Sequence, residues 1–179
     1  MSTPQLILLA VILAPGVTFV TFSVLWLLGW NAPEKALTRT TAVLYSTLTA
    51  ATAWLAWTMR MSGDAPIAVR LGDWFTVHEY RFPLEFLGDT LSLPFIAITV
   101  ILVGLIGQFS ATYLHRDPGF GRFYILLHLF AFGALVIFSA GSFDLLIGGW
   151  EMVGITSVLL ISFFHYRLGP VDGALHVFT

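Results

Sequence analysis

Two ionisable side chains, Glu151 and His128, lie inside long apolar stretches of this 179-residue sequence. On insertion scales, a charged side chain at the centre of a membrane helix costs about 2.5 to 3.5 kcal/mol, so such a residue is a candidate functional group. Burial raises the pKa of a carboxyl group, and an approaching cation lowers it again. A carboxyl group between these two influences can accept and release a proton, which is the chemistry of a proton relay.

Glycines surround the candidate proton-bearing residue Glu151. At 100° per residue, Gly148 and Gly154 fall within about 60° of Glu151 on a helical wheel, and Gly149 precedes the Trp150-Glu151 pair. Small residues allow another helix to approach closely. The sequence therefore predicts a carboxylate beside a helix contact. The alternative is a glutamate that is satisfied by a hydrogen bond and has only a structural role.

The other polar candidates each have a structural alternative. His128 could face the same interior as Glu151, although a lone histidine on an apolar helix is more often a hydrogen-bonded packing residue. His165 follows Glu151 by fourteen residues, which places it near the same helix face about 21 Å along the axis, as a relay exit or an interfacial cap. Asp144 marks the entrance of its segment, where a carboxylate also suits a helix N-terminus.

Composition excludes an ordinary water-soluble domain. Hydrophobic residues make up 58% of the chain and charged residues 10%, with a mean hydropathy of +0.89, whereas globular domains carry about 25% charged residues. Eight lysines and arginines and a net charge of −2 provide no basic stripe for nucleic acid. The absence of cysteine excludes disulfides and thiolate metal sites. We expect no flavin, iron–sulfur cluster, haem or other cofactor in this chain.

The apolar segments predict an all-α integral membrane protein with five transmembrane helices, the start of a sixth, and an outer β-hairpin between helices 2 and 3. We divide the chain into residues 1–61 with helices 1 and 2, 62–88 with the hairpin loop, and 89–179 with the remaining helices. The expected helices run over Gln5–Gly29, Thr40–Met61, Leu91–Leu114, Phe123–Gly141 and Leu145–Phe164, and the sixth begins near Gly173.

The loop between the second and third segments differs from its surroundings. Its apolar residues alternate at Ile67, Val69 and Leu71, and Gly72-Asp73 follows them as a turn signal. This pattern predicts a β-hairpin on the outer surface. The basic residues favour a membrane orientation with the N-terminus outside, because the loops on the inner side would then hold Lys35, Arg39, Arg116, Arg122 and Arg167.

The run from Gly149 to Ile161 resembles the signature G-W-E-x-x-G-x-x-S-x-L-L-I of the largest antiporter-like membrane subunit of respiratory complex I, which also occurs in the Mrp-type sodium/proton antiporter family. Residues 87–92 and 113–123 resemble the opening of the third helix in that family and the turn into the fourth. The resemblance implies a proton or sodium pathway in which Glu151 is coupled to lysines on later helices. It also implies an energy-transducing membrane, such as a bacterial inner membrane.

Two departures from the family affect this interpretation. The family builds its channel from two inverted repeats of five helices each. This sequence, in contrast, contains five predicted helices and ends near the start of a sixth. The only lysine is Lys35, so the coupled lysines must come from another chain or from a segment not included here. His176 stands where complex I relatives carry a lysine on the sixth helix, which makes it another candidate relay group.

The main hypothesis is an ion-translocating subunit, or its N-terminal part, in a complex I-like NADH:quinone oxidoreductase or an Mrp-like assembly. Its partners would be other membrane subunits and the lipid bilayer, and any redox chemistry would belong to those subunits. One alternative is a scaffold subunit that braces a larger complex without carrying ions. Another is a carrier of other solutes or a subunit of an inorganic-carbon accumulation complex with the same fold.

Overall fold

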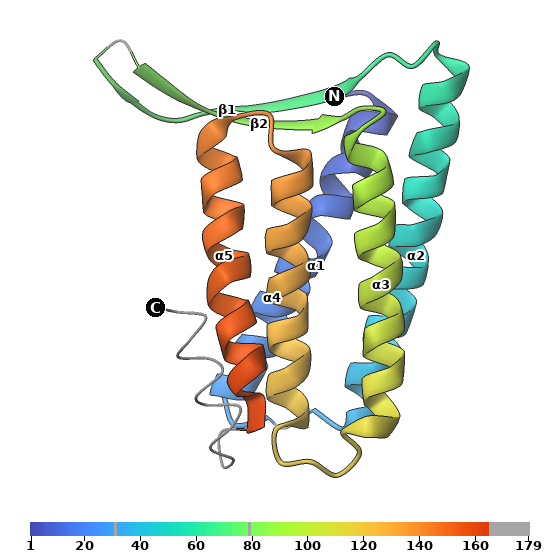
Figure 1. Ribbon diagram of the computed structural model, residues 1–179, viewed down its shortest axis with the longest axis vertical. Helices are drawn as coiled ribbons and strands as arrows, with labels where there is room; N and C mark the ends of the chain where they lie inside the picture. The colour runs from blue at the N-terminus through green and yellow to red at the C-terminus, as the bar shows by residue number, and fades with distance from the viewer. Residues whose placement is uncertain (31, 79, 165–179) are drawn as a thin grey trace.

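Five long helices run side by side, and a two-stranded sheet lies across one end of the bundle (Figure 1). The computed structural model describes residues 1–30, 32–78 and 80–164, so the predicted sixth helix and the histidines at 165 and 176 lie outside the described residues. The elements in chain order are α1 (Thr3–Leu27), α2 (Glu34–Met61), β1 (Ile67–Val77), β2 (Tyr80–Gly88), α3 (Ser92–Tyr113), α4 (Phe120–Ser139), α5 (Phe143–Ile161) and a short 3-10 helix (Ser162–Phe164).

Four of the helices in the described part, α1, α3, α4 and α5, are long and apolar enough to cross a membrane. The second predicted crossing, Thr40–Met61, does form a helix, but α2, although 28 residues long, is not apolar enough to count as a candidate span. Its sequence contains Glu34, Lys35, Arg39 and Arg60 as well as many threonines. The structure thus supports a membrane protein with four candidate spans and a fifth helix that is more polar.

Packing explains how α2 carries these polar residues. Its buried positions follow one another at intervals of three and four residues, so they form a single stripe that faces the bundle while the other faces stay exposed. Threonines on or beside this stripe donate to the backbone carbonyl one turn earlier, as Thr41 and Thr52 do. Their hydroxyl groups are therefore satisfied within the helix.

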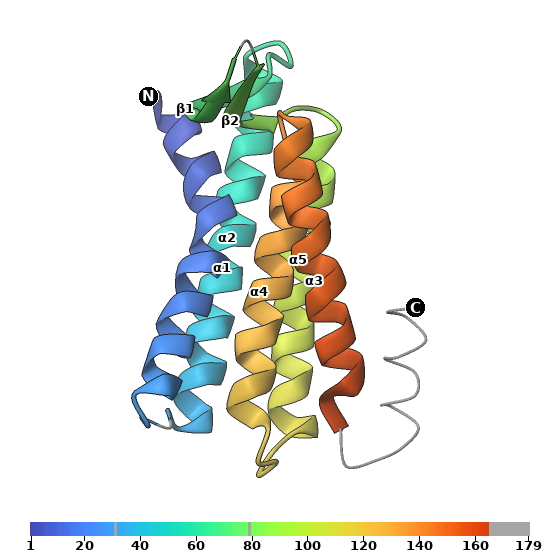
Figure 2. The same ribbon diagram turned by 90° about the vertical axis from the view of Figure 1, so that its left-hand side faces the viewer.

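Helix α4 occupies the centre of the bundle and packs against α1, α3 and α5, while α2 packs mainly against α3 (Figure 2). The main hydrophobic core joins residues of α1, α2, α3 and α4, including Ile12, Leu55, Ile96 and Leu135, each of which is fully buried. Helix α5 contributes little to this core and lies on the rim of the bundle.

The predicted hairpin is confirmed, but the predicted turn is wrong. Gly72 has a φ of +123° and lies at an irregularity in the β1–β2 register, so Gly72-Asp73 forms a bulge inside the hairpin. Pairing continues to Val77 and Tyr80, and the chain reverses between them. Glycine adopts positive φ in bulges as well as in turns, so the pattern at Gly72 was compatible with both. In the structure it forms a bulge.

Two hydrogen bonds hold the hairpin across the end of the bundle. The Gln5 side-chain amide donates to the Ala68 carbonyl on β1, and the Gly141 amide between α4 and α5 donates to the Glu85 carbonyl on β2 at 2.8 Å. A Cβ atom at position 141 would lie only 2.8 Å from Glu85, so only glycine allows this approach. We call this the hairpin end of the bundle.

Candidate functional site

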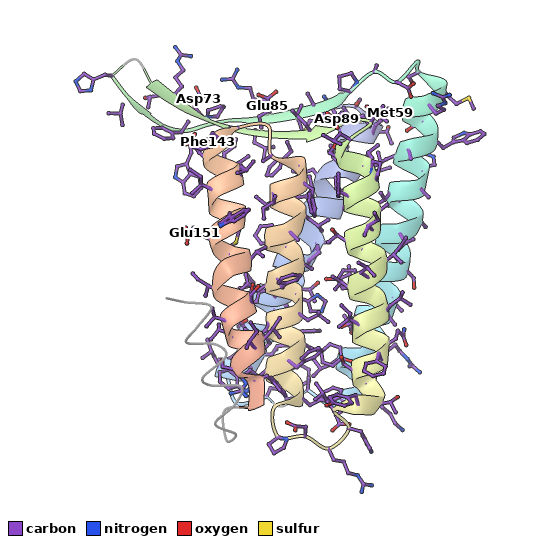
Figure 3. The ribbon with its side chains drawn as sticks, in the orientation of Figure 1. Met59, Asp73, Glu85, Asp89, Phe143 and Glu151 are labelled. Carbon is purple, nitrogen blue, oxygen red and sulfur yellow. The ribbon has the colours of Figure 1, made fainter. Side chains whose placement is uncertain are left out.

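Glu151 lies near the middle of α5 and points away from the rest of the bundle (Figure 3). The residue is exposed, and its carboxylate forms no hydrogen bond or ion pair with any residue that the structure describes. The fold alone therefore does not cover the residue that the sequence identified as the candidate proton carrier.

The three glycines near Glu151 have two different roles. A Cβ atom at Gly149 would lie 2.9 Å from the Gly133 carbonyl oxygen and 3.0 Å from the Ile137 amide nitrogen, so Gly149 allows α4 and α5 to cross in close contact. Gly148 and Gly154 would meet nothing within 4 Å. The predicted helix contact at Gly149 is thus formed by α4, while Gly148 and Gly154 border the open face around Glu151.

The open face of α5 is otherwise apolar. Trp150 is 68% exposed, and Ile147, Ile155 and Leu159 are exposed as well. An apolar face on a candidate membrane span contacts either lipid or another helix. A bare carboxylate in the middle of such a face is costly against lipid, and a cationic or hydrogen-bonding partner removes that cost.

His128 occupies the opposite kind of environment. Its ring is fully buried where α1, α2 and α4 meet. Nε2 lies 3.1 Å from the Thr41 hydroxyl oxygen, and Nδ1 lies 3.2 Å from the Tyr45 hydroxyl oxygen. The ring also stacks on Tyr45 and meets the edge of Phe22. Both ring nitrogens are therefore satisfied by α2, as the packing interpretation of a buried histidine requires.

The remaining candidates do not join Glu151 in a single cluster. Asp144 lies in the first turn of α5, where Ser142 provides the helix cap by accepting from the Leu145 amide at 3.5 Å. It lines a groove of about 780 Å³ between the hairpin and helices α1, α4 and α5. Among the described residues, no three His, Asp or Glu side chains lie together as a metal site would require.

Several interacting polar residues were not singled out from the sequence. Thr41 and Tyr45, the partners of His128, belong to the buried stripe of α2. The signal that could have found them is the recurrence of polar side chains at Thr38, Thr41 and Tyr45, which places them on one helix face.

At the end opposite the hairpin, a second cluster joins the first residue of α2 to the turn after α3, and the sequence identified the charges of this turn but not their partner Glu34. The Glu34 carboxylate accepts from His115 Nδ1 at 2.7 Å and from the Arg116 amide at 3.0 Å. The hydrogen bond from the His115 side chain lowers the pKa of Glu34. This contact fixes the start of α2 against the turn that leads from α3 into α4.

Asp89 fixes the start of α3 at the hairpin end. Its carboxylate accepts from the backbone amides of Ser92 at 2.7 Å and Leu91 at 3.0 Å, and its own amide donates to the Ser92 hydroxyl group. The hydrogen bond from the Ser92 amide is the main cause that lowers the pKa of Asp89. This arrangement satisfies helix amides that would otherwise lack a partner.

The fold and the site together define a helical integral membrane protein. Comparison with known proteins extends this: residues 74–124 match the family model described as the N-terminus of NADH-ubiquinone oxidoreductase (complex I) chain 5. The chain is 40% identical over 102 residues to NADH-ubiquinone oxidoreductase chain 5 of Mammuthus primigenius, which covers 57% of this chain and 17% of the relative. It is 33% identical over 116 residues to the chain 5 of Debaryomyces hansenii, covering 63% of this chain and 19% of that protein.

The resemblance to the antiporter-like membrane subunit of complex I is thus confirmed for its N-terminal portion. The matched region spans about a fifth of the length of these relatives. The residues that match the family model, 74–124, include the end of β1, all of β2 and α3, and the start of α4.

Proposed function

We propose that this chain is an ion-translocating antiporter-like subunit, or the N-terminal part of one, in the membrane arm of a complex I-like NADH:quinone oxidoreductase or an Mrp-like assembly. Protons or sodium ions are the transported species, and Glu151 is the proton-bearing group. In this proposal α2 crosses the membrane together with the four more apolar helices, since it runs alongside α3 through the bundle (Figure 1). The N-terminus and the hairpin lie on the outer side.

One observation supports this proposal most strongly: Glu151 stands alone in the middle of the open, apolar face of α5, and the two glycines beside it leave room for a helix backbone. A lipid-facing carboxylate would be costly, so this face suits a partner helix. A partner with an intramembrane lysine would bring a cation to the carboxylate, and its movement would change the proton affinity of Glu151. Other membrane subunits, or a further segment of the protein, supply that helix.

The test is Glu151→Gln in the native assembly, with ion pumping measured in membrane vesicles. Glutamine keeps the size and the hydrogen-bonding ability but cannot carry the proton, so we expect pumping to be lost while the assembly stays intact. Glu85→Gln is the matched control, because Glu85 lies on the hairpin and its substitution should leave pumping unchanged. Undiminished pumping by Glu151→Gln would reject the proposal.

The scaffold alternative makes the reverse prediction. It expects Glu151→Gln to be tolerated and the assembly to be lost when the hairpin is deleted. The hydrogen bonds from the hairpin to Gln5 and Gly141 support this alternative, because they connect α1 with the turn between α4 and α5. Measuring assembly and pumping on the same preparations separates the two functions.

A further inference from the structure

The groove between the hairpin and helices α1, α4 and α5, which we call the hairpin groove, is apolar apart from one carboxylate. Figure 2 shows α4 between α1 and α5, with the hairpin across their upper ends. Leu13 of α1, Val136 of α4 and Met152 of α5 belong to its walls, and Trp74 and Phe82 line it from the hairpin. Its volume of about 780 Å³ lies in the range of sites that bind small molecules.

The carboxylate in the hairpin groove is that of Asp144, the only charged residue among the described residues that line it. It forms no hydrogen bond or ion pair with any residue that the structure describes, whereas Asp64, Asp73 and Asp89 at the same end each accept a hydrogen bond. An aspartate side chain is short, so its carboxyl group lies close to the groove that the residue lines. The groove therefore presents one unpaired negative charge.

The charge and the apolar walls lie at different depths in the membrane. Asp144 is in the first turn of α5, and the candidate span of this helix begins at Phe143. Met152 follows Asp144 by eight residues, which places it about 12 Å further into the span. A ligand that matches this groove has a cation at the membrane surface and a hydrocarbon chain below it. A phospholipid with an ammonium headgroup has this chemistry.

The hairpin favours a lipid over a helix as the occupant of the groove. A spanning helix continues past the end of the bundle into water, but the hairpin crosses that end, and Trp74 and Phe82 line the groove there. A lipid, in contrast, ends at the membrane surface. The indole N–H of Trp74, which has no hydrogen-bond partner within the described structure, can donate to the lipid phosphate. Tryptophan is typical of this depth in membrane proteins.

We propose that the hairpin groove binds one molecule of phosphatidylethanolamine, with its ammonium group on the Asp144 carboxylate and an acyl chain along Val136 and Met152. A primary ammonium group carries charge and also donates hydrogen bonds, and such charge-assisted hydrogen bonds are roughly twice as strong as neutral ones. Glu151 does not line the groove, so a lipid bound there leaves Glu151 open to the partner helix of the proposed function.

The test is native mass spectrometry of the full chain in detergent, with phosphatidylethanolamine or phosphatidylglycerol of the same acyl chains added. The native chain should bind one phosphatidylethanolamine about tenfold more tightly than phosphatidylglycerol, because only the first lipid has a cation for Asp144. Asp144→Asn should remove this preference. Asp64→Asn is the matched control, because it removes an equal charge from the same end but outside the groove, and it should keep the preference.

A second variant tests the apolar part of the groove. Leu13→Trp leaves Asp144 in place and fills the groove from α1, so it should abolish lipid binding, even if Asp144→Asn does not fold. In the native assembly, phosphatidylethanolamine with a photoreactive acyl chain should label the segments of α4 and α5 that line the groove. A partner helix in the groove would prevent this labelling.

Five results would each overturn the proposal: equal affinity of the native chain for the two lipids, an unchanged preference in Asp144→Asn, a lost preference in Asp64→Asn, lipid retained by Leu13→Trp, or no labelling of the groove in the assembly. None of these measurements depends on ion pumping or on Glu151. They therefore stand apart from the test of the proposed function.

Discussion

The surroundings of His128 and the open face of α5 show two ways in which a membrane protein places a polar side chain among apolar helices. His128 is fully buried, and α2 satisfies both of its ring nitrogens. Glu151 is exposed, and no described residue satisfies its carboxylate. The first arrangement is complete within this chain, whereas the second requires a group from elsewhere. Substitutions should therefore affect the folding of the chain at His128 and its association at Glu151.

The largest expected effect comes from the two adjacent glycines of α5. Gly149→Leu places a side chain against the α4 backbone, where even a Cβ atom is too close, and should lower the free energy of unfolding by about 3 kcal/mol. Gly148→Leu meets open space and should leave that free energy unchanged. It should instead block the partner helix and abolish ion pumping in the assembly.

Denaturant unfolding of the purified chain in detergent measures the first effect, and vesicle assays of the assembly measure the second. Equal destabilisation by the two leucines would show that the face around Glu151 is already occupied. The contrast between a self-contained and an incomplete region would then be lost.

A smaller effect separates the two polar residues directly. His128→Leu leaves the Tyr45 hydroxyl group buried without its acceptor and should lower the free energy of unfolding by about 2 kcal/mol. Glu151→Leu removes an unpaired carboxylate from an apolar face, so the isolated chain should be as stable as before or more stable. Unfolding curves of both variants in the same detergent test this, and a destabilising Glu151→Leu would mean that the carboxylate has a partner within the chain.

The smallest expected effect on stability concerns Asp89 at the hairpin end, away from both polar residues compared above. Asp89→Ala removes the two hydrogen bonds to the start of α3 and should cost about 1 kcal/mol. Because folding lowers the pKa of Asp89, its contribution is complete above the usual pKa of an aspartate and is lost as the pH falls through the lower value. Stability should therefore decline on acidification more steeply in the native chain than in Asp89→Ala.

Asp89→Asn provides the matched control, because asparagine also caps helices but does not titrate. We expect it to retain most of the stability at neutral pH and to show the shallower pH dependence. An acid response identical in all three proteins would contradict the assigned role of the carboxylate.

Much of the architecture could be predicted from the sequence. The apolar lengths predicted α1, α3, α4 and α5 to within a few residues, and alternation between Ile67 and Leu71 predicted the hairpin. The turn was misplaced because glycine serves bulges as well as turns. The character of α2 was harder to anticipate, since a polar helix becomes compatible with the bundle only when its buried stripe meets suitable neighbours.

The candidate site was predicted less completely. Residue type alone singled out Glu151 and His128, because ionisable groups are rare in apolar helices. The sequence predicted one shared interior for both residues. In the structure His128 contacts α1 and α2, whereas Glu151 lies on the open face of α5. The structure also gives Gly149 a role unlike that of Gly148 and Gly154. Helical periodicity states which residues share a face but not which face meets a neighbour.

The sequence by itself determined that this is a membrane protein, that it is helical, and which rare polar residues lie inside its spans. These properties depend on local composition and on the length of the apolar segments. Only the tertiary structure decided which polar groups are satisfied. Thr41 and Tyr45 reach His128 from more than eighty residues away in the chain, and the position of α5 at the rim leaves Glu151 uncovered. Hydrogen bonds between distant segments depend on how whole helices pack, and local sequence does not encode that geometry.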